Sequence, residues 1–428
     1  MQNQNGKKVS KILIIGKGGR EHALAWKFAF DNPDTEIFVA EGNAGCELVP
    51  NVSNIGLTEI EDLVGFAMQN QIDLTVVGSE ELLVKGIVDK FEANNLKIFG
   101  PDKQAAMLEG SKAYAKDFMT KYGVKTAKYQ NFTDYAAALK YLKQVTFPVV
   151  IKASGLAAGK GVIIARNNDE AETALADMLL GMVFGESGSE VVIEEFLEGV
   201  EASILSFTDS QVIIPLISAK DHKKIGDGET GLNTGGMGVI APNPYITDKV
   251  NEEFIKDILE PTLHGIKMEK MDFAGVIFFG VMITKNGVYL LEYNMRMGDP
   301  ETQAVLPLMK NQLFPVLNAA IERKLDSVSL EWDSGATCCV VIASGGYPEK
   351  HHNGYAITGL EKFNLENSYL FAAGVAKKHD EFVTAGGRVL NVVAKGKSLD
   401  EARLNAYTAI GSISFKDMYY RSDIGKIS

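Results

Sequence analysis

Two oxygen donors and two charged side chains near residue 295 could bind a metal–nucleotide complex. Glu292 and Asn294 are two residues apart, so on a strand both side chains point to the same face. A carboxylate and an amide oxygen are hard donors that suit Mg²⁺ shared with a nucleotide phosphate. Arg296 continues this face at the end of the strand, and Asp299 follows the turn. An edge strand with a solvated polar face explains these residues equally well, so the choice depends on whether the chain supplies a nucleotide site.

The strand that carries Glu292 is expected to be the second of a hairpin. Phe273–Ile283 is an apolar run, and the turn at 285–287 contains Asn-Gly, a strong hairpin signal. The second strand then covers Leu290–Asn294. Three residues that alternate with the polar ones are expected on its buried side: Tyr289, Leu291 and Tyr293.

Length, charge and cysteine content restrict the class of protein. At 428 residues the chain is too long for one core, so we expect two to four domains. A net charge of −12 argues against a nucleic-acid or membrane-surface partner. No apolar run reaches the length of a membrane span, and Met1–Ser10 lacks the apolar segment of a signal peptide. The three cysteines form no disulfide framework, and Cys338 and Cys339, adjacent in an apolar run, are expected in the core; the cytoplasm is then the expected compartment.

The first hundred residues alternate between strand and helix patterns. Ile12–Ile15 is a buried-strand run, followed by a glycine turn and a helix pattern over Arg20–Phe30. Three further strand-like runs follow, at Glu36–Val39, Leu74–Val77 and Lys97–Phe99. Helix patterns lie between them, as at Glu59–Asn70 and Leu82–Asn94. This predicts an open parallel sheet wrapped by helices. Loops after the strands, at 16–20, 43–45 and 79–81, should then converge on one cleft, although plain turn chemistry explains each loop singly.

Two later segments have features of a nucleotide site. Phe147–Ala165 predicts two strands around a loop rich in Gly and Ala, with Lys152 and Lys160 bracketing it, as in a mobile phosphate-binding hairpin. An ordinary long hairpin is the alternative. In Glu190–Ser203, a strand ends at two glutamates beside an apolar pair, which suits an adenine pocket; solvated turn acids are the alternative. Lys112, on an amphipathic helix that ends near Gly123, is by itself better interpreted as a surface lysine.

The polar, glycine-rich stretch Ser218–Met237 is expected to be an active-site loop, because idle loops of this length are uncommon inside globular chains. Asp221, His222 and Lys223 could meet a small charged substrate, and residues 234–236 could form an anion nest. After Leu325 the chain restarts with alternating strands and a helix from Leu399, an α+β module without an evident catalytic set of its own.

Taken together, the glycine hairpin, the EEFL strand and the E-x-N strand resemble the ATP-grasp fold. The match is closer to one family. GKGGREHALAW, GNAG, LEGSKAYAKDF, IKASGLAAGKGV, IEEFLEGVEAS, DHK, TGLNTGGMG and EYNMRMGDPETQ resemble the phosphoribosylamine–glycine ligase (glycinamide ribonucleotide synthetase) family of purine biosynthesis. TGGMG with RMGDPET is more specific than any single glycine loop, and the resemblance runs from Lys11 into the terminal module.

The resemblance implies both a fold and a reaction. The fold class is α/β and α+β, with an N-terminal open parallel (pre-ATP-grasp) sheet over 1–110, an ATP-grasp domain over 111–328 with a mobile lid at about 125–195, and an α+β module over 329–428. The reaction joins glycine to 5-phosphoribosylamine with ATP and Mg²⁺ or Mn²⁺, through glycyl phosphate. A cytoplasmic monomer with no nucleic-acid or membrane partner is expected.

The resemblance also implies roles for individual residues. Glu292 and Asn294 hold the metal. ATP is bound by Lys112, Lys152, Gly155, Gly159, Lys160, Gly161, Glu194, Glu195, Phe196, Leu197 and Glu201. Phosphoribosylamine is bound by Gly18, Gly19, Arg20, Asn43, Ala44, Gly45, Glu81, Lys223, Thr234, Gly235, Gly236, Met237 and Gly238. Arg296, Asp221 and Asp299 are catalytic: Arg296 stabilises the transferring phosphoryl group, and the two aspartates are candidates for glycine's ammonium or the incoming amine.

Some positions depart from the family pattern. Ser79 stands where a proline is usual, Ser154 replaces an aspartate in the hairpin, and Leu232 replaces a proline before NTGGMG. None of these removes an implied ligand. Two rival functions stay open: another ATP-grasp ligase or carboxylase, and a nucleotide-binding regulator without turnover.

Overall fold

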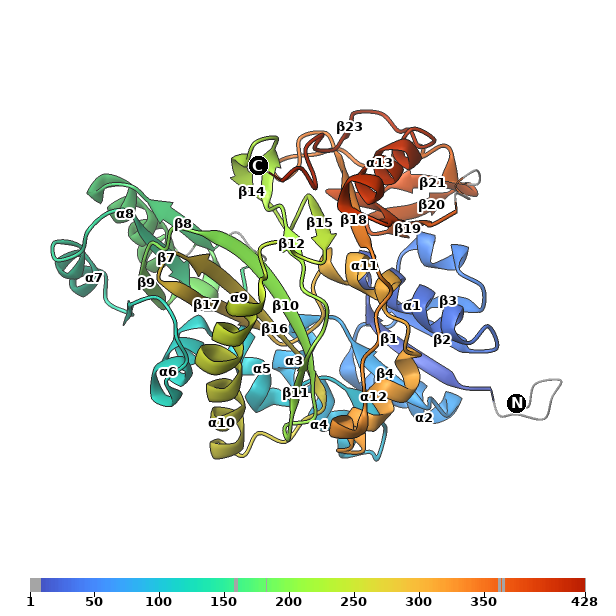
Figure 1. Cartoon of the computed structure of the whole chain (residues 1–428), viewed down its shortest axis with the longest axis horizontal. Helices are drawn as coiled ribbons and strands as arrows, with labels where there is room; N and C mark the ends of the chain where they lie inside the picture. Colours follow the sequence, from blue (N-terminus) through green and yellow to red (C-terminus); the bar gives the residue numbers. More distant parts are fainter. Residues whose placement is uncertain (1–8, 158–160, 182, 361–362, 364–365, 428) are drawn as a thin grey trace.

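The apolar run that begins at Lys11 is β1, the central strand of an all-parallel sheet in the order β3-β2-β1-β4-β5 (Figure 1). The computed structural model describes residues 9–157, 161–181, 183–360, 363 and 366–427. The strands of this sheet are β1 (Lys11–Gly16), β2 (Glu36–Glu41), β3 (Val52–Ile55), β4 (Leu74–Val77) and β5 (Ile98–Phe99). Ile12 and Ile14 face one core and Leu13 and Ile15 face another, so both faces are covered. The predicted open parallel sheet is confirmed.

Helices and one 3₁₀ turn connect these strands: α1 (Gly19–Asp31), η1 (Ala44–Leu48), α2 (Ile60–Asn70), α3 (Glu80–Lys85) and α4 (Ile87–Glu92). A further helix, α5 (Lys103–Gly110), follows the last strand. The prediction of one helix over Leu82–Asn94 is wrong. Gly86 has φ = +90°, and this left-handed residue ends α3 and begins α4 in a new direction. No helix among the described residues is long and apolar enough to cross a membrane.

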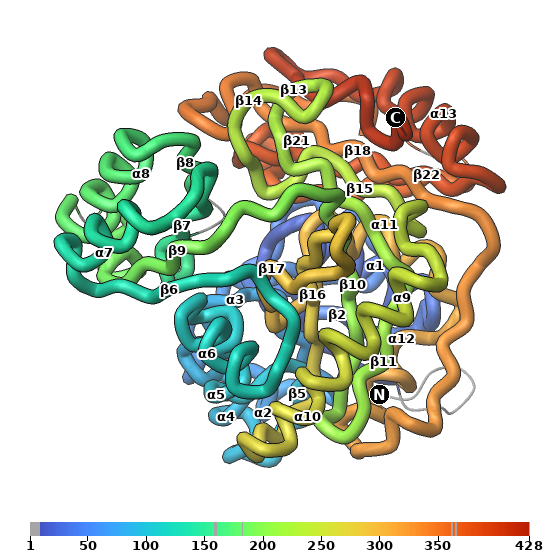
Figure 2. The backbone as a smooth tube through the Cα atoms, turned by 60° about the vertical axis from the view of Figure 1, so that its left-hand side comes forward, coloured from blue at the N-terminus to red at the C-terminus, as the bar shows by residue number. Residues whose placement is uncertain are grey.

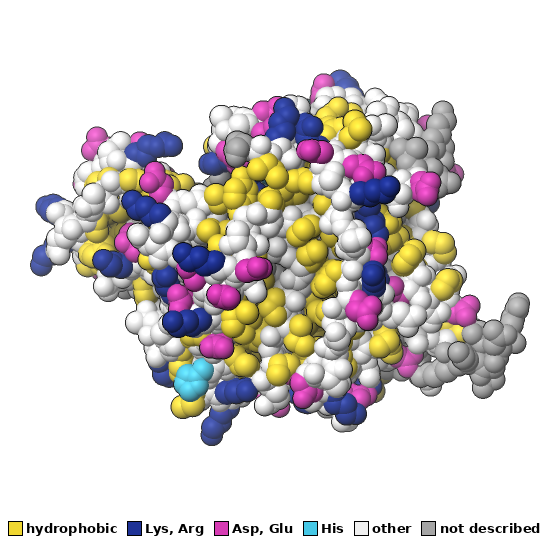
Figure 3. Space-filling model, in the orientation of Figure 1, with side chains coloured by type: hydrophobic (Ala, Val, Ile, Leu, Met, Phe, Trp, Pro, Cys, Tyr) yellow, Lys and Arg dark blue, Asp and Glu magenta, His cyan; other side chains and the backbone are white. Residues whose placement is uncertain are grey.

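A small antiparallel sheet, in the order β6-β9-β7-β8, forms a lobe that projects from the rest of the chain (Figure 2). Its elements are β6 (Tyr129–Phe132), α7 (Tyr135–Leu142), β7 (Val149–Ala153), β8 (Val162–Ala165), α8 (Asn168–Leu175), η2 (Ala176–Leu180), η3 (Gly185–Gly188) and β9 (Val191–Glu195). Ile151 and Ile193 pack on Leu175 of α8 to give the lobe its own core. The surface is indented between this lobe and the C-terminal module (Figure 3).

A second antiparallel sheet, β11-β10-β16-β17, carries the predicted metal strand. Its strands are β10 (Val200–Thr208), β11 (Ile213–Pro215), β16 (Gly275–Thr284) and β17 (Gly287–Asn294). Four helical segments accompany it: α6 (Lys112–Tyr122), α9 (Asp248–Phe254), η4 (Ile255–Leu259) and α10 (Glu260–Met268). Phe118, Phe254, Phe279 and Tyr293 share the core between sheet and helices. The predicted hairpin of β16 and β17 is confirmed.

A bulge in β17 changes which residues face that core. Val281 pairs with Leu290 and Gly280 with Glu292, which leaves Leu291 as an extra residue. Val288 and Leu290 are therefore buried before the bulge, and Tyr293 after it. The predicted inward placement of Tyr289 and Leu291 is wrong, because strict alternation does not continue across the extra residue. Glu292 and Asn294 still share one face.

The C-terminal module takes two strands from the middle of the chain. Its sheet runs β12-β15-β18-β22-β19, with β23 also paired to β18. The elements of this region are β12 (Lys220–Asp221), β13 (Lys224–Gly226), β14 (Thr230–Asn233), β15 (Gly238–Ala241), α11 (Glu301–Val305), η5 (Leu306–Leu308), α12 (Leu313–Ile321), η6 (Leu325–Ser327), β18 (Ala336–Ser344), β19 (Ser368–Ala372), β20 (Val375–Lys378), β21 (Glu381–Thr384), β22 (Arg388–Gly396), α13 (Leu399–Ile410) and β23 (Met418–Tyr419). The stretch Ser218–Met237 is thus partly β-structure and joins this sheet to the β10 sheet.

The N-terminal sheet and the C-terminal module pack tightly at Ala372. His22 Nδ1 accepts a hydrogen bond from the Ala372 N–H at 2.9 Å, and Asn43 Nδ2 donates to the Ala372 carbonyl at 3.0 Å. Burial lowers the pKa of His22 to about 4, so its ring is neutral and can accept. A Cβ on Gly45 would stand 2.1 Å from the Ala372 Cβ. The loop over 43–45 is therefore one of the contacts between the two modules, together with His22 of α1.

This contact makes Gly45→Ala a test of the packing. The added methyl must displace Ala372, and we expect a loss of about 1–3 kcal/mol in unfolding free energy, as for other overpacked sites. Gly56→Ala is the matched control, because nothing lies within 4 Å of a Cβ there. Urea unfolding of both variants measures the difference; equal midpoints for Gly45→Ala and the parent chain would contradict the contact.

Candidate active site

Glu292 is an ionised carboxylate set among cations. It is half-buried directly after the β17 bulge, and its side chain makes no hydrogen bond or ion pair with any described residue. Burial alone would raise the pKa of Glu292, but Lys223, Lys152, Lys112 and Arg296 together lower it below the ordinary value. A charged oxygen donor without a protein partner fits a bound cation.

Asn294 and Arg296 lie beside Glu292 and are held by carboxylates. Arg296 Nη2 donates to Asn294 Oδ1 at 3.2 Å and lies 2.8 Å from Glu109 Oε1. Glu109 is buried, and its other oxygen accepts from the Met295 N–H at 2.7 Å. Glu80 approaches the Arg296 Nε at 3.7 Å. The guanidinium is therefore oriented before any substrate arrives, and the Asn294 oxygen keeps one lone pair for a metal.

Two protein donors are few for a divalent metal. Among the described residues no group of three or more His, Cys, Asp and Glu side chains could hold a metal ion. Glu292 and Asn294 fit a cation whose shell is completed by phosphate oxygens and water, as is usual for Mg²⁺.

Lys152 is directed toward Glu292 from the projecting lobe. It lies at the end of β7, its Nζ is 2.9 Å from Glu194 Oε1, and it donates to the Leu291 carbonyl at 3.3 Å. Burial lowers the pKa of Lys152, but Glu194 and Glu292 raise it above the ordinary value. The ammonium is thus charged and joins the lobe to the bulge of β17.

Lys112 begins α6 and is not the surface lysine that its pattern alone favours. Its Nζ donates to the Gly155 carbonyl at 3.2 Å, and burial lowers its pKa although Glu292 acts in the opposite direction. Ser154 lies beside it: its hydroxyl accepts from the Ala113 N–H at 3.1 Å, and its carbonyl accepts from the Lys112 N–H at 2.7 Å. Ser154, which replaces the aspartate of the family pattern, therefore bonds the hairpin to the start of α6.

The rest of the hairpin is only partly described. Gly155 donates its N–H to the Ser187 carbonyl at 3.0 Å, and the Gly161 carbonyl accepts from the Ala153 N–H at 2.8 Å. Gly159 and Lys160 lie outside the described residues.

The two glutamates at the end of β9 face opposite sides. Glu194 is buried between Lys152 and Lys116, whereas Glu195 is half-exposed and accepts from the Lys128 N–H at 2.9 Å. Phe196 and Leu197 follow at the surface, with Phe196 37% exposed. The structure does not bring Glu194 and Glu195 to one spot, because neighbouring strand residues point apart.

Glu201 and Lys223 form an ion pair next to Glu292. Lys223 Nζ lies 2.7 Å from Glu201 Oε2, and this carboxylate is the main reason why the pKa of Lys223 is raised. Glu201, which was predicted to bind the nucleotide, is therefore in direct contact with Lys223, which was predicted to bind the substrate.

Asp221 has a buried oxygen without a partner. Its Oδ1 accepts no hydrogen bond from the described residues, and burial and nearby Glu301 raise its pKa well above the ordinary value. Glu301 itself accepts from the Ser203 hydroxyl at 3.0 Å. Two acids with too little positive charge between them suit an incoming ammonium.

The loop at 234–238 is closed on itself. The Gly236 N–H donates to Thr234 Oγ1 at 3.0 Å, the Gly235 N–H donates to the Tyr347 hydroxyl at 3.1 Å, and Met237 is fully buried. Gly238 begins β15. Two backbone N–H groups of the predicted anion nest are therefore already hydrogen-bonded within the protein.

Asp299 faces the module contact. It pairs with Arg388 at 3.4 Å and accepts from the Arg20 N–H at 3.3 Å and from Gln303 Nε2 at 2.9 Å. Burial would raise the pKa of Asp299, but Arg388 and Arg20 lower it. Asp299 was predicted to hold an ammonium group, but Arg388 already pairs with its carboxylate.

The N-terminal residues also serve this contact. Arg20 is nearly buried; its Nε bonds Glu21 at 2.5 Å and its Nη1 donates to the Met297 carbonyl at 3.1 Å. The space beside Gly18 is filled by Asp299, and that beside Gly19 by Asn391 and Gln303. Asn43, Ala44 and Gly45 lie against the C-terminal module. Glu81 is exposed; its neighbour Glu80 is the one that faces the arginines.

Several residues at the site are not among those predicted: Glu80, Glu109, Lys116, Glu301 and Arg388. Three of them had a local signal: Lys116 follows Lys112 by four residues and so shares its helix face, Glu80 lies in the loop at 79–81, and Glu301 closely follows Asp299. Glu109 and Arg388 contact Arg296 and Asp299 from distant parts of the chain, which no spacing shows.

Sequence profiles of one family match nearly the whole chain. The N domain of phosphoribosylglycinamide synthetase matches residues 10–109, its ATP-grasp (A) domain 110–302 and its C domain 337–427. The chain belongs to the phosphoribosylglycinamide synthetase family. The phosphoribosylamine–glycine ligases of Fusobacterium nucleatum and Clostridium acetobutylicum are 60% and 54% identical to it; each match covers 97% of this chain, and 98% and 99% of those proteins.

Solved structures agree with the synthetase family. The crystal structure of phosphoribosylamine–glycine ligase from Thermotoga maritima is 33% identical, with a TM-score of 0.84, and the match covers 97% of this chain and 100% of that one. A biotin carboxylase complex from Campylobacter jejuni has a TM-score of 0.75 at 16% identity, covers 96% and 93% of the two chains, and shows the shared ATP-grasp fold. Family membership makes the chain an ATP-dependent ligase, a class that in general depends on a divalent metal.

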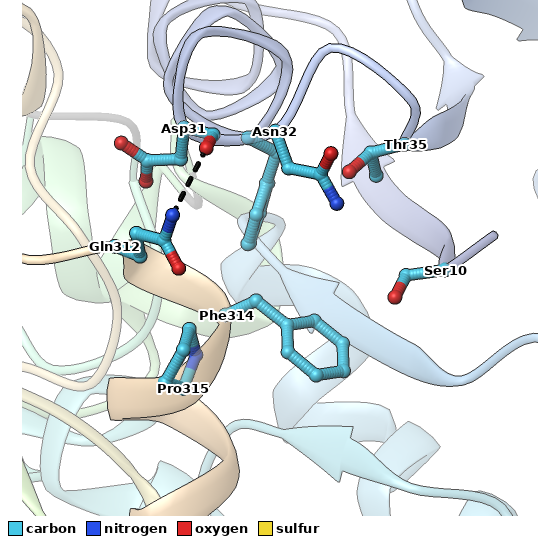
Figure 4. A pocket seen from close by; sticks show the side chains of 8 residues that line it. Ser10, Asp31, Asn32, Thr35, Gln312, Phe314 and Pro315 are labelled. Carbon is cyan, nitrogen blue, oxygen red and sulfur yellow. Dashed lines mark hydrogen bonds between the residues drawn. The ribbon is translucent and has the colours of Figure 1, made fainter. Parts of the chain in front are cut away.

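One crevice of the molecule lies away from these residues. It is lined by Ser10, Phe28, Asp31, Asn32, Thr35, Gln312, Phe314 and Pro315, and Gln312 Nε2 donates to the Asp31 carbonyl at 3.1 Å across it (Figure 4). The crevice lies at the C-terminal end of α1, whereas Gly18–Arg20 lie at the other end of this 13-residue helix, about 20 Å away at 1.5 Å per residue.

The Asp299 pairing predicts a pH-dependent loss of stability in Asp299→Asn. The folded-state pKa lies below the ordinary 3.8, so the ionised carboxylate stabilises the fold above that pH, and this contribution is lost as the pH falls through the folded value. We expect the variant to lose about 1–3 kcal/mol at pH 7, less than a fully buried pair would cost. Its deficit should shrink below about pH 4.

Urea unfolding across pH 3 to 8 measures this deficit, with the exposed Asp326→Asn as the matched control. A deficit of the same size at every pH would contradict the assignment, since it would then come from shape rather than charge.

Proposed function

We propose that this chain joins glycine to 5-phosphoribosylamine at the expense of ATP, giving glycinamide ribonucleotide, ADP and phosphate in purine biosynthesis. Family membership supports the overall reaction. The single structural observation that carries the site is Glu292, a charged and unpartnered carboxylate encircled by Lys112, Lys152, Lys223 and Arg296. That arrangement can accept a metal and polyanionic phosphates together.

The chemistry requires an activated carboxylate. Glycine's own carboxylate is a poor acyl donor because its leaving group would be oxide. Transfer of the ATP γ-phosphoryl group to a carboxylate oxygen forms glycyl phosphate and ADP, and attack by the amine then forms the amide and releases phosphate. The protein needs mainly to align the reactants and to neutralise developing charge.

The nucleotide lies between the two antiparallel sheets in this proposal. Glu292 and Asn294 would hold a divalent cation, Mg²⁺ or Mn²⁺, which when bound neutralises charge on the ATP phosphates. Lys152 and Lys112 contact the α- and β-phosphates. Residues 194–197 border the adenine, with Glu195 and backbone groups free to pair with its edge, and Glu201 takes the ribose. Gly155 and Gly161 of the hairpin border the phosphates in this proposal.

The acceptor side extends toward the C-terminal module. Arg296, already oriented by Glu109 and Glu80, stabilises the transferring phosphoryl group. Asp221 is better placed than Asp299 to receive glycine's ammonium, because its Oδ1 has no partner. Phosphoribosylamine would enter beside the loops at 18–20 and 43–45 and be covered by 234–238, which limits the exposure of this labile amine to water. We further propose a cytoplasmic monomer, with domain limits near 110 and 328 and a lid near 125–195.

The deciding assay measures ADP release with each substrate omitted in turn. Release should require both glycine and 5-phosphoribosylamine. Release with bicarbonate in place of glycine would favour an ATP-grasp carboxylase, and ATP binding without turnover for any pair would favour a regulator.

Isotope transfer tests the intermediate. Glycine labelled with ¹⁸O in its carboxylate should pass one label to inorganic phosphate, because the phosphate departs with the oxygen to which it was attached. Mass spectrometry of the released phosphate detects the label. Product formation with unlabelled phosphate would rule out glycyl phosphate.

Substitution of Glu292 by Gln tests the metal-binding face. The charge is lost while shape is kept, so turnover should fall by at least about a hundredfold, as for loss of a key electrostatic group. The fold should stay intact, with some loss of melting temperature, because the cations that lower the pKa of Glu292 lose its charge. Glu331→Gln, an exposed carboxylate, is the control. Near-normal turnover in Glu292→Gln would remove it from the metal shell.

A further inference from the structure

Lys116 is a buried ammonium to which the proposed reaction gives no role. It lies on α6 and is 2% exposed. Its Nζ is 3.1 Å from Glu194 Oε2 and donates to Thr126 Oγ1 at 2.7 Å, and it stands 5.7 Å from the centre of the Tyr129 ring. An ammonium has three N–H donors, and two of those of Lys116 are directed at Glu194 and Thr126. The Tyr129 ring lies near the same ammonium, so Lys116 is held inside the protein.

The contacts of Lys116 form two arms that end on the same strand. In one arm, the Glu194 carboxylate bridges Lys116 and Lys152, and Lys152 donates to the Leu291 carbonyl. In the other, the Thr126 hydroxyl donates to the Leu290 carbonyl at 2.6 Å. The arms thus meet at consecutive carbonyls of β17, at the bulge directly before Glu292.

The resulting ring connects both sheets of the nucleotide cleft. Glu194 and Lys152 belong to the projecting β6-β9-β7-β8 sheet, whereas Leu290 and Leu291 belong to the β11-β10-β16-β17 sheet. Thr126 lies on the segment that passes from α6 to that lobe, and it forms a parallel bridge with Leu290. A change in this ring would alter both the direction of Lys152 and the spacing of the sheets.

Charge explains why Lys116 should matter to Lys152. One carboxylate, Glu194, is shared by two ammonium groups, so neither holds its full attraction. Burial lowers the pKa of Lys116 to about 8, so burial opposes the charge of this second cation while Glu194 favours it. Lys152 already contacts Glu194 at 2.9 Å, and without Lys116 the carboxylate would hold Lys152 more strongly and leave it less available to a phosphate. An apolar residue in a buried ionic group can be neutral or stabilising for the fold, so stability alone does not explain the lysine.

We propose that Lys116 is a positioning residue of the nucleotide site, which through Glu194 and Thr126 sets the Lys152 ammonium and the two sheets for ATP. This inference rests on the proposed nucleotide site but not on which acceptor or amine is joined.

The test is Lys116→Met, with ATP binding measured by calorimetry in the absence of glycine and amine. We expect the dissociation constant for ATP, and the KM for ATP, to rise about tenfold to a hundredfold, the range for a displaced positioning contact. The KM for glycine should stay within twofold. Lys121→Met is the matched control on the same helix, because Lys121 is exposed and pairs only at the surface with Glu269.

Further variants separate positioning from folding. Lys116→Arg keeps the charge and should recover most of the ATP affinity. Thr126→Val should weaken ATP binding in the same direction while Thr126→Ser does not, and Lys116→Met with Thr126→Val should cost less than the sum of the two, since both break one ring. These Thr126 variants serve also if Lys116→Met does not fold.

The proposal is overturned if Lys116→Met binds ATP within twofold of the parent chain, if the KM for glycine rises equally, or if Lys121→Met has the same effect. It is likewise overturned if Thr126→Val leaves ATP binding unchanged. Failure of the proposed ligase reaction would appear differently, as a parent chain that binds ATP but releases no ADP with glycine and 5-phosphoribosylamine.

Discussion

A single negative charge at the end of β17 must stay ionised in a half-buried cleft, and much of the site follows from this requirement. Glu292 keeps its charge because Lys223, Lys152, Lys112 and Arg296 outweigh the effect of burial on its pKa. The overall charge of the chain is −12, so these cations have to be gathered locally. Lys152 comes from β7, Lys112 from α6, Lys223 from the segment after β12, and Arg296 from just after β17. The surroundings of Glu292 are therefore assembled from several parts of the fold.

Those cations are in turn restrained by acidic side chains. Glu194 holds Lys152 and Lys116, Glu201 holds Lys223, and Glu109 holds Arg296. Such pairs reduce the freedom of long side chains before ATP binds, which lowers the cost of ordering them in the complex. The bulge at Leu291 contributes to the same end, because its carbonyl becomes an acceptor for Lys152.

The C-terminal module takes part in the site although it carries no catalytic set of its own. Arg388 donates to the carbonyls of Gly235 and Asp299 and pairs with the Asp299 carboxylate, so it links the glycine-rich loop to the turn after β17. Because β12 and β15 belong to the C-terminal sheet, Asp221 and Gly238 are part of that module. The surroundings of Asp221 therefore depend on how this module packs against the rest of the chain.

The sequence by itself determined the secondary-structure elements that depend on local residue patterns. The parallel sheet, the hairpin carrying Glu292 and Asn294, the glycine hairpin with Lys152 and the final helix all follow from apolar periodicity and turn residues. Family motifs extended this to ATP and its acceptors. Local patterns could not show the break at Gly86 or the bulge at Leu291, since each depends on one backbone conformation within an otherwise regular run.

Only the tertiary structure decided the partners of the charged residues. Glu194 and Glu195 are neighbours in sequence, yet one is buried between lysines and the other bonds the backbone near the surface. Asp299 and Asp221 look alike as acids near glycines, but Arg388 occupies the first and leaves an oxygen of the second without a partner. The physical reason is that Coulomb and desolvation effects depend on distance in space, and contacts such as Arg388 with Asp299 join residues far apart along the chain.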